Sequence, residues 1–397
     1  MINLAVRVIG PDHPGITADL MSTLAALEVE LQDVEQVLVR QRLILAAVVG
    51  TSRPASVRRE LAAFGVRHGL SVQLDEVAEA TWAPAETQVI TVLAPEITPA
   101  ALEIITDTVG SLGGNIDRIV RLATYPVYCY ELRVSGADPD RVRAEVAAAG
   151  AAARVDVAVQ RDSLGRRAMR LVAFDVDSTL VQGELIDEVA KVAGCGEEVR
   201  AITAAAMAGE LDFEEALRAR VALLEGMELA VLERVAEEVE LTPGARTLVR
   251  TLKRLGFGLV AFSGGFDVMT DIVGRRLGLD ATHANHLEVR DGLLTGKLEG
   301  RVVDRARKGE LLSELAHRAG VPLEQTVAVG DGANDLDMLG RAGLGIAFNA
   351  KTVLREAADA SISVPYLDVV LFMLGVGRHE VERERLTRSH PPGAPAP

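Results

Sequence analysis

The stretch LVAFDVDSTLVQGE, residues 171–184, decides the fold of the second half of the chain. Consecutive apolar residues lead into Asp175, which is typical of a strand buried on both faces of a parallel sheet. Carboxylates are poor strand formers and are costly to bury, so Asp175 and Asp177 need a chemical reason to stand here. Side chains at positions i and i+2 of a strand point the same way, which predicts that the two carboxylates act together.

Three further apolar runs follow, with helical sequence between them. These runs are GFGLVAFSGG (256–265), TVAVGDGAND (326–335) and GLGIAFNA (343–350). Strands that alternate with helices predict a right-handed, doubly wound α/β sheet, whose ligands bind beyond the carboxyl ends of the strands. The polar residues expected to converge there are Asp175, Asp177, Ser263, Asp331 and Asp335, with Lys308 opening the helical segment before the third run.

These residue types indicate phosphoryl chemistry. Several carboxylates at one place repel each other unless a cation neutralises them, and oxygen ligands without His or Cys favour Mg²⁺. A Lys, a Ser hydroxyl and Gly amides can bind phosphoryl oxygens. No Ser–His or Cys–His pairing is apparent, so the available nucleophile is a carboxylate that would form an aspartyl-phosphate.

With these motifs in order, residues from about Arg170 to Gly375 resemble the haloacid dehalogenase-like phosphohydrolases. The resemblance implies that Asp175 is the nucleophile and that Asp177 is the general acid and base. It implies phosphate binding by Ser263, Gly264, Lys308 and Asn334. It implies Mg²⁺ binding by Asp175, by Asp177 through its backbone carbonyl, and by Asp331, supported by Asp335.

The insertion at about 185–240 is predicted to form a helical cap over this crevice. From composition alone, Glu184 and Arg220 are more readily explained as solvated helix residues. However, DVDSTLVQGE, MAGELDFEEALRARVALLEG and FSGGF together resemble the phosphoserine phosphatases. That resemblance implies that Glu184 binds the ammonium and Arg220 the carboxylate of O-phospho-L-serine, with Met207 and Phe213 as apolar cap contacts. It also implies the last step of L-serine biosynthesis.

Two alternatives stay open at this point. The enzyme could transfer the phosphoryl group to another small alcohol, or hydrolyse a different small phosphate ester. Alternatively, the chain could be chiefly an amino-acid sensor with an idle phosphatase domain, although its intact set of catalytic residues argues against that.

The first half contains an internal repeat of order βαββαβ, at about residues 3–77 and 88–160. Such a repeat predicts two α+β modules of ferredoxin-like topology. The stretches VIGPDHPGI and LGGNIDRI resemble ACT domains, which bind amino acids and regulate an attached enzyme. This resemblance implies L-serine or a related amino acid as effector, bound by Asp12, His13, Gly15, Gly114 and Asn115. We also expect a homodimer; a purely dimerising role for these modules is the alternative.

Composition and boundaries complete the prediction. The net charge of −15 argues against nucleic acid as the main partner. The chain shows neither a signal peptide nor a stretch able to span a membrane, so we expect a cytoplasmic protein. The expected domains are 1–80, 86–160 and 168–376, with a linker around 161–167 and a frayed helix with a disordered tail at 377–397.

Overall fold

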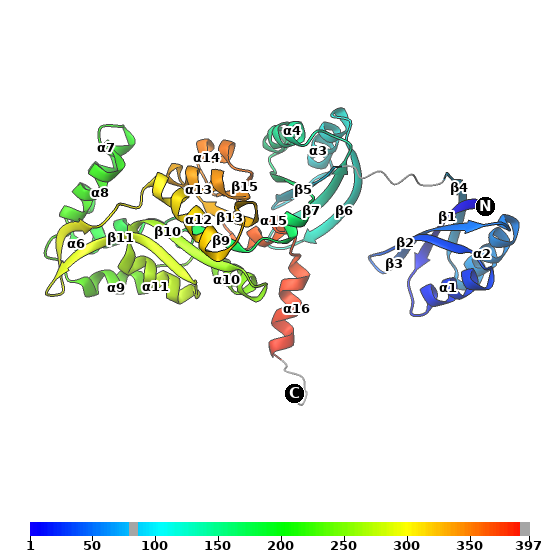
Figure 1. Ribbon diagram of the computed structural model, residues 1–397. Helices are drawn as coiled ribbons and strands as arrows, with labels where there is room; N and C mark the ends of the chain where they lie inside the picture. Colours follow the sequence, from blue (N-terminus) through cyan, green and yellow to red (C-terminus); the bar gives the residue numbers. More distant parts are fainter. Residues whose placement is uncertain (79–85, 390–397) are drawn as a thin grey trace. The chain divides into compact units, whose positions relative to one another are not determined.

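The computed structural model describes residues 1–78 and 86–389, without the side chains of Arg167, Met207, Thr352 and 384–389. The chain divides into two units, Met1–Pro84 and Ala85–Pro397, and each is described by itself. Figure 1 labels their helices and strands. No helix in the described ranges is long and apolar enough to cross a membrane. The cytoplasmic location stays a prediction.

The first unit is one α+β module. Its elements are β1 (Ile2–Pro11), α1 (Ile16–Ala26), β2 (Glu30–Val39), β3 (Arg42–Thr51), α2 (Pro54–His68) and β4 (Ser71–Val77). The strands form a sheet of order β2-β3-β1-β4. Every second residue of β1 between Leu4 and Val8 is buried, and these side chains pack against Ile16 and Leu20 of α1 and Phe64 of α2. The predicted ferredoxin-like topology is confirmed.

The second copy of the repeat begins the second unit. Its elements are β5 (Thr87–Ala94), α3 (Pro99–Ser111), β6 (Asn115–Ala123), β7 (Tyr128–Ser135), α4 (Pro139–Ala153) and β8 (Asp156–Arg161). Its strand order, β8-β5-β7-β6, repeats the order β4-β1-β3-β2 of the first unit. The same sequence pattern has therefore produced the same topology twice.

The rest of the second unit is a doubly wound α/β fold, as predicted. Its parallel strands are β9 (Leu171–Asp175), β10 (Gly258–Phe266), β11 (Ala281–Arg290), β13 (Thr326–Gly330), β14 (Leu344–Phe348) and β15 (Ala360–Ile362). Its main helices are α10 (Ala245–Arg254), α11 (Asp267–Leu277), α12 (Arg305–Ala319), α13 (Leu336–Arg341), α14 (Thr352–Ala357) and α15 (Val370–Met373). All residues of β9, β13 and β14 are buried, which explains their unbroken apolar runs.

The insertion after β9 is helical, as expected. It contains α6 (Leu185–Ala193), α7 (Gly196–Met207), α8 (Phe213–Ala222) and α9 (Leu229–Glu238). An unexpected hairpin of β11 and β12 (Leu293–Glu299) packs against it, because β12 contacts α8 and the Gly226 N–H donates to the Leu294 carbonyl at 2.8 Å. Figure 1 shows α6–α8, in green, at one end of the second unit and β5–β7, in teal, at the other.

The two parts of the second unit share a single sheet of eleven strands. The junction is an antiparallel pairing of β8 with β15, at Ala158 and Ala360. Asp156 reinforces it by accepting hydrogen bonds from the Ser363 N–H and hydroxyl at 2.7 and 2.9 Å. Sequence patterns did not reveal this junction, because they report each strand's own periodicity and not its partner.

Both segments that flank the predicted phosphatase domain contain helices. The expected linker at 161–167 contains the short helix α5 (Leu164–Arg167), and Arg166 forms an ion pair with Glu131 of β7 at 2.7 Å. The C-terminal segment, where a frayed helix and a disordered tail were expected, contains α16 (Arg378–Ser389), which Arg378 ties to Asp368 at 2.8 Å. Residues 390–397 lie outside the described residues. The division into separate domains at 160–168 therefore stays a prediction.

Candidate active site

The two aspartates that follow the first parallel strand have different partners. Asp175 is the last residue of β9 and is almost completely buried. Asp177 lies just beyond the strand, where its carboxylate accepts hydrogen bonds from the Leu185 N–H at 2.7 Å and the Ser263 hydroxyl at 3.1 Å. Burial raises the pKa of Asp177, and these hydrogen bonds oppose the rise. Asp177 is therefore held in position between the cap entrance and β10.

Lys308 is fully buried between two carboxylates. It lies in the first turns of α12, whose N-cap Asp304 accepts from the Arg307 N–H at 2.8 Å. Its Nζ lies 2.6 Å from Asp175 and 2.8 Å from Asp335. Burial alone would lower the pKa of the Lys308 ammonium, but the two carboxylates raise it overall. Lys308 is therefore charged.

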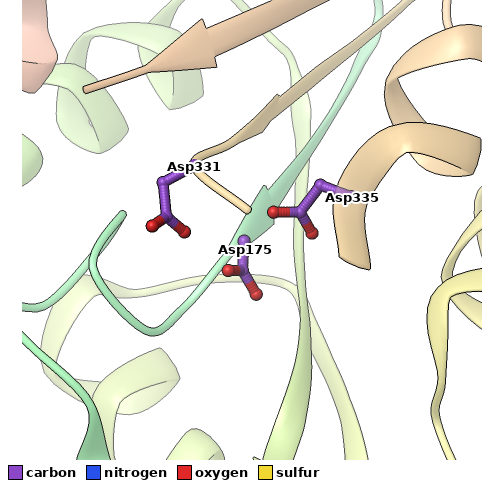
Figure 2. A group of neighbouring side chains, drawn as sticks. All are labelled: Asp175, Asp331 and Asp335. Atoms are coloured by element: carbon purple, nitrogen blue, oxygen red, sulfur yellow. The ribbon is translucent and has the colours of Figure 1, made fainter. Parts of the chain in front are cut away.

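Three carboxylates converge at the ends of β9 and β13 (Figure 2). Asp175, Asp331 and Asp335 each offer an oxygen within 4.8 Å of the others. Burial, followed by the charge of Asp335, raises the pKa of Asp331 to about 6. The same two causes raise the pKa of Asp175, and Lys308 opposes them. A divalent cation would relieve the remaining repulsion, and an all-oxygen donor set fits Mg²⁺.

This acidic cluster contains Asp175 and Asp331, the two side chains that the family resemblance assigns to the metal. The resemblance assigns Asp177 to the metal through its backbone carbonyl, with Asp335 in support. In the structure the Asp335 side chain also belongs to the cluster, whereas the Asp177 carboxylate is engaged by the Leu185 N–H and the Ser263 hydroxyl. The ligand set stays a prediction.

The carboxyl end of β10 brings hydroxyl and amide groups to the same edge of the sheet. Ser263 is fully buried, and its Oγ accepts a hydrogen bond from the Gly265 N–H at 2.8 Å. Asn334 lies in the short 3-10 helix Ala333–Asp335 after β13, between Asp331 and Asp335 in the chain. The structure therefore places the predicted phosphate-binding residues on β10, α12 and the loop after β13.

Two cap residues of opposite charge lie close to these carboxylates. Glu184 is the N-cap residue of α6, and its Oε1 accepts from the Ser178 hydroxyl at 3.3 Å. Burial, then the charges of Asp177 and Asp331, raise the pKa of Glu184 to about 7. Burial lowers the pKa of Arg220 on α8, and the Glu184 carboxylate opposes that change. The two cap charges therefore influence each other and the nearby carboxylate of Asp177.

The cap also meets the carboxyl end of β10 through an aromatic ring. A methyl group added at Gly264 would lie 3.1 Å from Cζ of Phe213, the first residue of α8. A side chain at position 264 would therefore press against the Phe213 ring and require it to shift. Met207 ends α7, but its side chain lies outside the described residues.

Relatives of known name match almost the whole chain. It is 50% identical to a phosphoserine phosphatase of Streptomyces coelicolor, over 96% of this chain and 93% of that protein. It is 48% identical to a phosphoserine phosphatase of Mycobacterium tuberculosis, over 96% of this chain and 95% of that protein. The chain belongs to the phosphoserine phosphatase family.

The domains of this family member match known domain families. Residues 172–340 match the haloacid dehalogenase-like hydrolases, and residues 3–75 and 86–160 each match an ACT domain. A crystal structure of a HAD family hydrolase from Salmonella enterica is 30% identical and superposes with a TM-score of 0.64, covering 72% of this chain and 98% of that one. The predicted family and fold class are thereby confirmed.

The predicted effector residues of this phosphatase-family chain lie in two separate units. In the first, His13 is exposed and its ring stacks at 5.6 Å from that of His68, while Gly15 begins α1 with a φ of 98°. The backbone N–H of Asp12 donates to the Gln41 carbonyl at 3.1 Å. In the second, Asn115 donates to Asp117 at 2.7 Å, and Gly114 packs tightly against the Val109 side chain. Effector binding stays a prediction.

One buried polar residue near the site was not predicted. Asn285 of β11 donates to the Gly264 carbonyl at 2.8 Å and accepts from the Val303 N–H at 2.7 Å. Its sequence signal is weak, since a single Asn within THANHLEV is a poor strand former with no motif around it.

Proposed function

We propose that this protein hydrolyses O-phospho-L-serine to L-serine and phosphate with the aid of Mg²⁺. The observation that carries the proposal is the pair of opposite charges, Glu184 and Arg220, beside Asp177, which follows the buried nucleophile candidate Asp175 by two residues. An amino acid needs one anion and one cation placed apart, and this pair offers both. The names of the two full-length relatives support the same substrate.

We assign the substrate contacts by charge. The ammonium group would bind the Glu184 carboxylate, and the substrate carboxylate would bind the Arg220 guanidinium. Phe213, and Met207 by resemblance, would cover the apolar part of the substrate. The phosphate group would bind Ser263, Gly264, Lys308 and Asn334, whose hydroxyl, amide and ammonium groups are suitable donors.

Asp175, Asp331 and Asp335 are the side chains that would hold Mg²⁺. When bound, the ion would neutralise charge on the phosphoryl oxygens and on these carboxylates. The family resemblance adds the backbone of Asp177 as a further ligand.

The reaction would proceed in two displacements. In the first, an oxygen of Asp175 attacks phosphorus while the bond to the serine oxygen breaks, and Asp177 gives that oxygen its proton. In the second, Asp177 takes a proton from water, which attacks the aspartyl-phosphate and releases phosphate. Lys308, held 2.6 Å from Asp175, favours the ionised form of the nucleophile and offsets the negative charge that develops.

The Asp175→Asn variant tests this assignment. We expect it to lose phosphoserine hydrolysis by roughly a thousandfold or more, because an amide cannot act as the nucleophile. Asp337→Asn is the matched control, since Asp337 is a carboxylate on α13 that pairs with Arg305 outside the cluster. Substantial Mg²⁺-dependent hydrolysis by Asp175→Asn would contradict the mechanism. A panel of phosphate monoesters, with and without acceptor alcohols, tests the substrate.

We further propose a homodimer that L-serine or a related amino acid regulates through the ACT domains. The duplicated module and the turn at Asp12, His13 and Gly15 support this role. Serine inhibition of the full chain should weaken in a chain that begins at Ala85, which lacks the first unit. Identical inhibition of both would contradict regulation through the first ACT domain, and a monomer in analytical ultracentrifugation would contradict the dimer.

A further inference from the structure

The Gly264–Gly265 peptide at the end of β10 is held at both of its polar groups. Its carbonyl, on Gly264, accepts a hydrogen bond from the Asn285 side-chain amide at 2.8 Å. Its N–H, on Gly265, donates to the Ser263 Oγ at 2.8 Å. Because a peptide unit is planar, fixing these two opposite groups fixes the orientation of the whole unit.

This arrangement decides what the Ser263 hydroxyl can do. A hydroxyl has one proton to donate and two lone pairs that can accept. The Gly265 N–H occupies one lone pair, and the hydroxyl proton points to Asp177 at 3.1 Å. Ser263 is therefore held as a donor toward the crevice, which is the role that an anionic phosphate requires.

The same amide side chain also reaches the element that carries Lys308. The Asn285 Oδ1 accepts from the Val303 N–H at 2.7 Å, directly before Asp304, the N-cap residue of α12. The Lys308 N–H in turn donates to the Asp304 carbonyl at 3.0 Å. Asn285 is only 2% exposed, so water offers no ready substitute for either hydrogen bond.

We infer that Asn285 is a positioning residue that sets the phosphate site by joining the carboxyl end of β10 to the start of α12. It does not touch the reacting atoms; it acts through the Gly264–Gly265 peptide and through Val303. Two of the groups that would hold phosphate, the Ser263 hydroxyl and the Lys308 ammonium, depend on this one side chain for their relative placement. The inference rests on the proposed function only in taking phosphate as the ligand.

The Asn285→Asp variant separates the two hydrogen bonds. Its carboxylate keeps the acceptor for the Val303 N–H but replaces the amide donor with an oxygen that repels the Gly264 carbonyl. We expect inorganic phosphate, titrated calorimetrically into the full chain with Mg²⁺, to bind about tenfold more weakly or worse, and kcat/KM to fall similarly. The rise in thermal midpoint caused by Mg²⁺ should stay unchanged, because the acidic cluster does not contact Asn285.

Thr326→Val is the matched control. Thr326 is a buried side chain that also bridges two backbone groups, donating to the Leu323 carbonyl at 2.7 Å and accepting from the Gly343 N–H at 3.4 Å. It lies at the amino end of β13, whereas the site lies at the carboxyl ends. Its loss should lower the thermal midpoint and leave phosphate affinity unchanged.

Each outcome has a distinct meaning. Unchanged phosphate affinity in a folded Asn285→Asp variant would overturn the inference, as would an equal loss of affinity in Thr326→Val. If Asn285→Asp fails to fold, Asn285→Ser serves in its place. The serine side chain adds no buried charge, and it is too short to reach both the Gly264 carbonyl and the Val303 N–H. Failure of the unsubstituted chain to bind phosphate would overturn the proposed function.

Discussion

At the scale of single residues, charge balance in the crevice depends on Lys308. Lys308→Met would leave Asp175 and Asp335 buried without a cation, and we expect the metal-free protein to lose about 3 kcal/mol of stability at about pH 8. The loss should shrink toward about pH 5, because the pKa of Asp175 is already raised and protonation removes the uncompensated charge.

Denaturant unfolding at the two pH values measures this loss. Lys191→Met is the control, since Lys191 is exposed and pairs with Glu188 at 2.5 Å on the helix surface. A loss independent of pH, or one no larger than that of the control, would show that Lys308 does not balance the buried carboxylates.

The raised pKa of Glu184 predicts how substrate binding depends on pH. With a pKa of about 7, Glu184 is ionised above that pH and neutral below it, so it attracts the substrate ammonium only on the alkaline side. We expect KM for phosphoserine to rise as the pH falls from about 8 to 6. Glu184→Gln should raise KM at least about tenfold and remove this part of the pH dependence.

Steady-state kinetics across this range test the prediction, with Glu188→Gln as the control. Glu188 lies on the same helix, where it pairs with Lys191 at the surface. If KM of Glu184→Gln shows the same pH dependence as KM of the unsubstituted chain, that dependence belongs to another titrating group, such as the substrate phosphate.

At the scale of elements, the loop after β13 is expected to bind the metal. Chelation should lower the thermal midpoint of the full chain and Mg²⁺ should restore it, because an ion that binds only the folded state stabilises it. Asp331→Asn should abolish this Mg²⁺ response, whereas Asp337→Asn should keep it. Differential scanning calorimetry measures both, and a full response in Asp331→Asn would exclude Asp331 as a ligand.

The cap helix α8 begins with a capping box that positions Phe213 and Arg220. Asp212 accepts from the Glu215 N–H at 2.8 Å, and the Glu215 side chain accepts from the Asp212 N–H at 3.0 Å. Asp212→Ala should cost about 1 kcal/mol of stability and raise KM, because the first turn of α8 frays. Thermal unfolding and steady-state kinetics test this prediction. Glu214→Ala, which removes a surface ion pair with Arg218 on the same helix, is the control. Equal KM values for the two variants would contradict the prediction.

At the scale of the whole molecule, the shared sheet predicts where the chain can be cut. A chain beginning at Ala85 should fold and hydrolyse phosphoserine, because the cut lies between the two units. A chain beginning at Asp162 loses β8, which exposes the edge of β15 and removes the partners of Ser363 and Met373. We expect it to aggregate or to unfold at a lower temperature.

Size-exclusion chromatography and thermal unfolding of the two shortened chains test this difference. Equal stability and solubility would mean that the β8–β15 junction is dispensable and that the boundary predicted at 161–167 separates independent domains.

Local sequence accounts for the elements that carry the site. The runs before Asp175 and Asp331 predict buried strands because full burial on two faces leaves an unbroken apolar pattern, and a polar residue then marks the strand end. The two βαββαβ repeats were likewise predicted, since each element has its own periodicity. The β11–β12 hairpin was not predicted, because the mixed polar and apolar residues there match neither the helical nor the strand period clearly.

The sequence by itself determined the fold class, the repeat and the residues that gather at the carboxyl ends of the strands, because periodicity and strand ends are local properties. Only the tertiary structure decided that Asp335, and not the side chain of Asp177, joins the acidic cluster. It also decided that Asn285 bridges Gly264 and Val303, and that β8 meets β15. Each of these depends on which distant segments come within hydrogen-bond reach, and no single segment encodes its partner.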